Sequence, residues 1–121
     1  MKREDFEALV AESIDELPEE FIGRFENIDF VVEDRPSKDL VARLGLRSDC
    51  SILGLYHGVP LKRRTHYYGA VLPDKITIYQ KNIEIHCKTD GEIKHQIQKT
   101  VIHEVAHHFG MTEGEIRKLG F

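Results

Sequence analysis

The residues with the clearest chemical meaning lie near the end of the chain, where His103, Glu104 and His107 form the pattern H-E-x-x-H. On an α-helix, side chains four positions apart leave the same face about one turn apart. His103 and His107 can therefore bind one Zn²⁺ ion through ring nitrogens while the backbone stays regular. Glu104 lies roughly 100° around the helix from His103. Its carboxylate then flanks the metal and can hold and deprotonate a metal-bound water, which makes Glu104 the candidate catalytic base.

A third metal ligand is needed, because a catalytic zinc ion usually has three protein ligands and one open position. Gly110, three residues after His107, lets the chain turn sharply out of the helix. Glu113 lies ten positions after His103, where the turned-back chain can present a carboxylate to the metal. The sequence therefore predicts His103, His107 and Glu113 as the three ligands.

The alternative third ligand is Glu115, two positions further along the chain. Glu115 also matches a capping box with Thr112, which predicts a final short helix over residues 113–119 and gives Glu115 a structural role. The neighbouring His108 points roughly 100° away from His107, so we expect it to pack or hydrogen-bond elsewhere. The other histidines have no helical relation to the motif and are expected at the surface or in hydrogen bonds: His57, His66, His86 and His95.

A long helix is expected to contain the motif. Thr89 and Glu92 match a capping box at its start, and the helix is predicted from about Glu92 to Phe109. Gly110 then supplies the left-handed residue that ends it. Most faces of this helix are apolar, but one narrow polar stripe contains Gln96, Thr100, His103 and His107. A helix of this kind is buried with its polar stripe facing a cleft, and a metal site is expected in that cleft.

Apolar residues at helical spacing predict an N-terminal helix over residues 3–17, which Pro18 ends. A short turn of helix is expected over 19–25 and a short helix over 37–44. Residues 82–88 are interpreted as a loop or a short helical turn. These segments are expected to cover the core, since they contain no residues arranged for chemistry.

Runs rich in β-branched and aromatic residues predict four short strands. The runs are 28–32, 52–56, 62–68 and 76–79. The third run is the weakest of the four. It contains His66, which is of interest because the adjacent Tyr67 and Tyr68 could donate hydrogen bonds to a developing oxyanion.

The composition is that of an ordinary globular protein, with 40% hydrophobic and 31% charged residues among 121. The chain is long enough for one core, so we expect one domain over residues 1–121. The net charge of −4 argues against nucleic acid or an acidic membrane surface as the main partner. We expect no membrane span and no signal peptide. Cys50 and Cys87 are isolated, which predicts two reduced thiols in a cytoplasmic protein.

Residues 103–113 resemble the H-E-x-x-H-x-x-G-x-x-[D/E] signature of the minimal zincin-like family, small bacterial zinc metallopeptidases. The resemblance extends to residues 72–79 and loosely to the strands at 28–32 and 52–56. It therefore covers most of residues 28–120. It implies an α+β fold, in which a small twisted mixed sheet of about four strands packs on the metal-binding helix. The predicted N-terminal helix and short C-terminal helix complete this fold.

By position, the resemblance implies that His103, His107 and Glu113 bind Zn²⁺. Glu104 would be the general base. The resemblance also implies that an edge strand above the cleft, here residues 76–79, pairs with extended substrate. The sequence therefore predicts a zinc-dependent peptidase that acts on a peptide or protein. The alternative is a metal-binding domain that recognises a peptide or protein partner without cleaving it.

Overall fold

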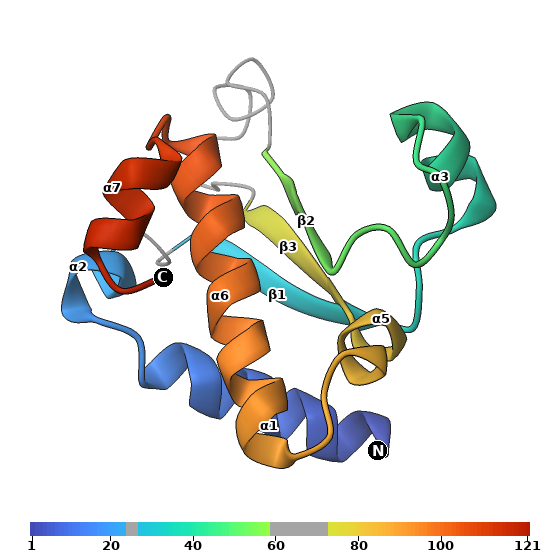
Figure 1. The fold of residues 1–121 in the computed structure, drawn as a ribbon, viewed down its shortest axis with the longest axis horizontal. Coiled ribbons are helices and arrows are strands. Elements are labelled where there is room, and N and C mark those ends of the chain that lie inside the picture. The colour runs from blue at the N-terminus through green and yellow to red at the C-terminus, as the bar shows by residue number, and fades with distance from the viewer. Residues whose placement is uncertain (24–26, 59–72) are drawn as a thin grey trace, which may run out of the picture.

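The computed structural model describes residues 1–23, 27–58 and 73–121. Figure 1 shows α6 crossing the small sheet, with α1 near its first turns and α7 beside its last turns. In chain order the described elements are α1 (Arg3–Asp15), α2 (Glu19–Ile22), β1 (Ile28–Glu33), α3 (Lys38–Leu44), β2 (Gly54–His57), β3 (Asp74–Tyr79), α5 (Gln80–Ile85), α6 (Asp90–His108) and α7 (Glu113–Lys118). The predicted α+β class with a small mixed sheet is confirmed.

The sheet has the strand order β1-β3-β2. β1 pairs with β3 in parallel, and β2 pairs with β3 antiparallel, with Gly54 opposite Ile78. Because β3 has a neighbour on both sides, the prediction that residues 76–79 form an edge strand is wrong, and β2 lies at the edge of the described sheet. The strand predicted over residues 62–68 falls outside the described residues.

The helix termini follow the local signals in the sequence. Thr89 is the N-cap of α6, and its hydroxyl accepts a hydrogen bond from the Glu92 N–H at 3.1 Å. The other half of the predicted capping box is wrong, because the Glu92 carboxylate accepts from the Lys88 N–H at 2.6 Å instead. Gly110 adopts the predicted left-handed conformation, with φ of 79°. Residues 82–88, interpreted as a loop or turn, contribute most of the short helix α5.

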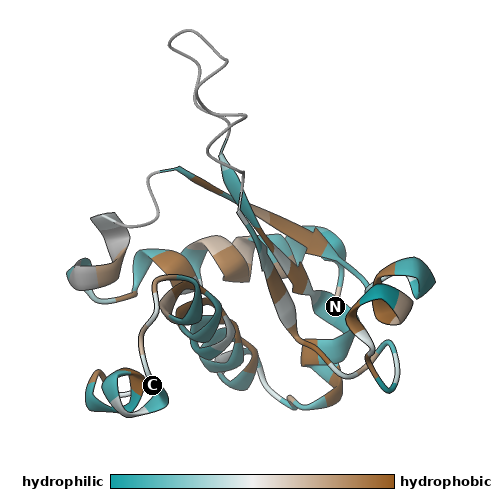
Figure 2. Ribbon diagram, turned by 90° about the horizontal axis from the view of Figure 1, so that it is seen from above, coloured by the Kyte–Doolittle hydropathy of each residue, from teal (hydrophilic) through white to brown (hydrophobic). Residues whose placement is uncertain are grey.

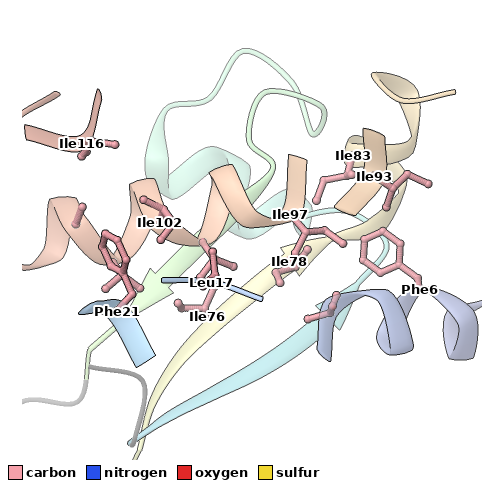
Figure 3. Packing of buried hydrophobic residues seen from close by; sticks show 14 residues of the cluster. Phe6, Leu17, Phe21, Ile76, Ile78, Ile83, Ile93, Ile97, Ile102 and Ile116 are labelled. Carbon is pink, nitrogen blue, oxygen red and sulfur yellow. The ribbon is translucent and has the colours of Figure 1, made fainter. Parts of the chain in front are cut away.

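The hydrophobic core lies between α6, α1 and the face of β3 that bears Ile76 and Ile78 (Figure 3). The predicted apolar stripe of α6 is buried, since Ile93, Ile97 and Val101 are at most 6% exposed. Burying this stripe fixes the rotation of α6 about its own axis. The polar stripe of the helix therefore faces away from the core.

Figure 2 looks from above along α6 and shows polar and apolar residues mixed on each helix. None of the described helices is long and apolar enough to cross a membrane. The helices are instead amphipathic, which suits elements that cover one side of a core.

Candidate metal centre

The structure brings together the three residues predicted as metal ligands. Potential ligand atoms of His103, His107 and Glu113 all lie within 4.8 Å of one another. The Glu113 Oε1 atom is 2.8 Å from His107 Nε2 and 3.6 Å from His103 Nδ1. Two imidazoles and a carboxylate form a common donor set for catalytic Zn²⁺, and three protein ligands leave a coordination position open. The chemistry of these side chains therefore fits a zinc ion.

The two histidines are positioned by the burial of the opposite faces of α6. Ile102, which precedes His103, and Val105 and Ala106, which lie between the two histidines, are completely buried. After the turn at Gly110, Glu113 is the first residue of α7. A hydrogen bond from the Met111 N–H to the Ala106 carbonyl, 2.8 Å long, holds this turn against the end of α6. The turn thus brings the carboxylate back to the imidazoles.

Glu115, the alternative ligand, is engaged at the start of α7. Its carboxylate accepts hydrogen bonds from the Thr112 N–H at 3.4 Å and the Thr112 hydroxyl at 3.1 Å. The Thr112 hydroxyl in turn accepts from the Glu115 N–H, which completes the predicted capping box. This geometry favours Glu113 over Glu115 as the third ligand.

Glu104 lies between the candidate ligands and the edge strand β2. Its Oε2 atom accepts a hydrogen bond from the Tyr56 N–H at 3.3 Å. Burial raises the pKa of Glu104, and the Tyr56 N–H and the nearby His107 and His103 partly oppose this rise. The pKa of Glu113 shifts in the opposite direction. Its carboxylate accepts a hydrogen bond from His107, and this bond lowers the pKa. The pKa values of the two carboxylates, Glu104 and Glu113, are therefore shifted in opposite directions.

Alternate residues of the β2 segment lie beside every fourth residue of α6. The pairs are Gly54 with Thr100, Tyr56 with Glu104, and Gly58 with His108. Two strand residues rise about 6.6 Å and four helical residues about 6.0 Å, so the strand and the helix stay in register. A Cβ atom at Gly54 would lie 2.8 Å from the Thr100 Cγ2 atom. Glycine at this position therefore allows the close approach that places the Tyr56 N–H on Glu104.

His108 packs away from the candidate metal ligands, as predicted. Its ring stacks on the Tyr56 ring with centroids 4.0 Å apart and planes 21° apart. The Tyr56 hydroxyl donates a hydrogen bond to the Asp74 carboxylate at 2.5 Å. These contacts tie the last turn of α6 to β2 and β3. The role of Tyr56 could not be recognised from the sequence, because a tyrosine at a strand end is common.

A further contact that could not be predicted from the sequence involves His103. Its Nε2 atom lies 3.1 Å from the backbone oxygen of Phe121. A backbone oxygen only accepts, so Nε2 is the donor in this contact, and Nδ1 is the ring nitrogen on the side of Glu113. The Phe121 ring packs edge-on against Phe21, with centroids 6.4 Å apart. This contact between distant residues has no local sequence signal.

The predicted polar stripe of α6 does face a cleft. A cavity of about 300 Å³ is lined by its members Gln96, Thr100 and His103, together with Glu104. His107 lies beyond the cavity at the more exposed end of the stripe, where its side chain is 52% exposed. The candidate base therefore lies at the junction of the metal-binding group and the cavity.

The other candidates do not join this site. Among the described residues, the potential metal-binding group contains none of His57, His86 and His95. His66, Tyr67 and Tyr68 fall outside the described residues. Cys50 and Cys87 are free thiols, as predicted. Burial raises the pKa of the Cys87 thiol, which lowers its reactivity.

The zincin-like metallopeptidase family matches the chain over residues 25–121. No match is found among curated proteins. A solved structure of a conserved hypothetical protein from T. thermophilus is similar, with 21% sequence identity and a TM-score of 0.53 over 89% of this chain and 94% of that one. At this identity the likeness shows the fold alone. Because the family match spans most of the chain, including the whole candidate metal centre, the chain belongs to the zincin-like metallopeptidase family.

Proposed function

We propose that the protein is a zinc-dependent metallopeptidase, in which His103, His107 and Glu113 bind the metal and Glu104 is the general base. The observation that supports this proposal most is the placement of one half-buried carboxylate beside a convergent group of two imidazoles and an acid. Family membership supports the reaction class. We further propose that residues 1–121 act as one domain.

Glu104 would act as the proton acceptor of the reaction. A bound Zn²⁺ ion supplies polarisation of the scissile carbonyl and acidification of the attacking water. Glu104 would take a proton from that water and transfer it to the nitrogen of the leaving amine. The Tyr56 N–H holds one carboxylate oxygen and leaves the other for the water. A raised pKa suits this role, because a base with a higher pKa accepts the proton more readily.

The substrate in this proposal is a peptide or protein segment in extended form. β2 lies at the edge of the described sheet and runs alongside α6 past Glu104. A peptide that follows this edge would bring its backbone to the candidate base. The edge strand proposed to guide the substrate is thus Gly54–His57 rather than residues 76–79.

The Glu104→Gln variant tests the proposal. The amide oxygen of glutamine can still accept from the Tyr56 N–H but cannot take a proton, so the fold and stoichiometric zinc binding should be retained. Hydrolysis of a broad peptide mixture, followed by mass spectrometry, should fall by about 10²–10⁴-fold. Equal hydrolysis by Glu104→Gln would refute the general-base role. Zinc and peptide binding without any cleavage by the native protein would favour the non-catalytic alternative.

A further inference from the structure

The cavity beside the candidate metal centre has one end at the proposed reaction site. Glu104 lies at that end, and Gln96 lies at the other, about 12 Å away along α6. Its volume of about 300 Å³ is near the lower limit of the roughly 300–1,000 Å³ that is usual for ligand sites. The cavity is therefore suited to a side chain or a short segment of a substrate.

The polar lining of this cavity is rich in hydrogen-bond donors. The lining residues with donor side chains are Lys99, Gln96, Thr100 and Ser51. Of these, the Gln96 amide donates to the Thr100 hydroxyl at 3.4 Å, and the Ser51 hydroxyl accepts from the Ser48 N–H at 3.1 Å. The carboxylate in the lining belongs to Glu104, whose Oε2 atom already accepts from the Tyr56 N–H. The lining therefore offers donors to a ligand that has acceptors.

Lys99 is the cation of this lining, and its charge is not compensated within the described part of the chain. It forms no ion pair with any residue that the structure describes. Lys94 on the same helix differs, since its ammonium lies 3.0 Å from Glu12 and 2.6 Å from Glu16. The ammonium of Lys99 thus remains available to an anionic group in the cavity.

The cavity wall opposite α6 is held in place by a buried side chain on its far side. Asn82 is completely buried, and its Nδ2 atom donates to the carbonyl oxygens of Asp49 at 2.6 Å and Ile52 at 2.8 Å. Ile52 and Ser51 belong to the cavity wall. The close contact of Gly54 with Thr100 fixes the next part of the same segment. The cavity is therefore built by the fold rather than formed by a ligand.

We propose that this cavity selects an acidic substrate side chain, with Lys99 as the specificity-determining residue. Lys99 lies about 7.5 Å from Glu104 along α6, and an extended peptide advances about 3.3 Å per residue. The acidic side chain would thus lie about two residues from the bond that is cleaved. The overall net charge of −4 favours basic ligands, so a preference for acid requires a local cause such as Lys99. The part of this inference that concerns the cleaved bond rests on the proposed function, whereas the preference in binding does not.

A binding experiment tests the inference without hydrolysis. The zinc-loaded Glu104→Gln variant of the 121-residue chain is titrated by calorimetry with hexapeptides that differ only in the position and the type of one residue, which is Glu, Gln or Lys. When the variable residue is at the position that enters the cavity, the Glu peptide should bind about fivefold more tightly than the Gln peptide. Adding Lys99→Glu should reverse this order in favour of the Lys peptide, and Lys99→Gln should abolish the preference. Higher salt should weaken the native preference.

Lys38→Glu is the matched control, because Lys38 is exposed at the start of α3 and lies outside the cavity lining. It makes the same change in net charge and should leave the preference intact. Absence of an acidic preference at every position, or a preference that both Lys99 variants retain, would overturn the inference. The native protein is then given the same peptides. Cleavage without an acidic preference would refute only this inference, whereas a Lys99-dependent preference without cleavage would refute only the peptidase.

Discussion

The two helices that meet at the candidate metal centre hold their side chains by different means. α6 has 19 residues, and its apolar faces are part of the core, so His103 is fixed by packing along the helix. α7 has 6 residues, and its position depends on the buried Ile116 and the Thr112 cap. The side chain of His103 is 24% exposed, whereas those of Glu113 and His107 are 50% and 52% exposed. Both histidines still belong to the helix that is packed into the core, and the acid belongs to the short helix added beside it.

This difference has a consequence for how the site responds to mutation. Changes in the core of α6 must disturb the fold before they disturb the histidines. Changes in the turn or cap before α7 can move the Glu113 carboxylate while the core stays intact. The candidate third ligand is thus the part of the site that is adjusted most readily.

Removal of a ligand should have the largest effect on zinc binding. A structural zinc site with four ligands has a binding free energy of about 10–16 kcal/mol, which is about 3 kcal/mol per ligand. His107→Ala should therefore weaken zinc binding on the order of 100-fold, measured by competition with a chromophoric chelator. Glu113→Gln should weaken it less, because the amide oxygen remains a neutral donor. Glu115→Gln is the control, and a larger loss there than in Glu113→Gln would make Glu115 the ligand.

Disruption of the contact between β2 and α6 should have the next largest effect. This effect is on the stability of the fold. Gly54→Ala places a methyl group against Thr100 Cγ2, so we expect a loss of about 1–3 kcal/mol in the free energy of unfolding. Thr100→Ser removes that Cγ2 atom and should restore part of the loss in the double variant. Gly23→Ala is the control, since nothing lies within 4 Å of its added Cβ. Equal effects of the two glycine substitutions in urea unfolding would contradict this explanation of Gly54.

The α7 cap should have a smaller and local effect. Thr112→Ala removes a side-chain acceptor that contributes about 1 kcal/mol to helix stability. We expect faster amide exchange in α7 and zinc binding weakened by a few fold. Thr89→Ala removes the same kind of cap from the far end of α6 and should leave zinc affinity unchanged. Equal losses of zinc affinity in both variants would show that α7 has no special role in holding the third ligand.

The pH dependence of stability gives the smallest effect and separates the two carboxylates. The raised pKa of Glu104 means that the folded metal-free protein binds its proton more tightly than the unfolded chain. This contribution is present at acid pH and is lost as pH rises through the folded pKa. The lowered pKa of Glu113 has the opposite sign, so its contribution is lost as pH falls. In the presence of a chelator, Glu104→Gln should therefore gain thermal stability relative to the native protein at pH 7, and Glu113→Gln should lose it.

Local patterns were sufficient to predict that the three candidate ligands come together. Four-residue spacing put both histidines on one face of a helix, and the burial of the apolar faces turned that face to a cleft. The turn at Gly110 and the Thr112 cap depend on neighbouring residues only, so they could be recognised from the sequence. The arrangement of His103, His107 and Glu113 followed from these short-range rules.

Contacts between distant segments could not be predicted in this way. The order of the strands depends on the parallel pairing of β1 with β3, which moves β2 to the edge. The Tyr56 N–H reaches Glu104, which is 48 residues later, only because of that order. The role of Gly54 has the same origin, since its neighbour Thr100 is on another element. Local patterns therefore brought together the candidate ligands, and the sheet topology determined what surrounds the candidate base.

The most direct test of the three-ligand metal centre is a crystal structure of the protein with zinc, with anomalous data collected on both sides of the zinc absorption edge. We expect one anomalous peak within about 2.0–2.2 Å of a ring nitrogen of His103, a ring nitrogen of His107 and a carboxylate oxygen of Glu113. The Glu104 carboxylate should lie beside the peak without binding it. A peak coordinated by Glu115 in place of Glu113, or no peak between the two histidines, would contradict the proposed metal centre.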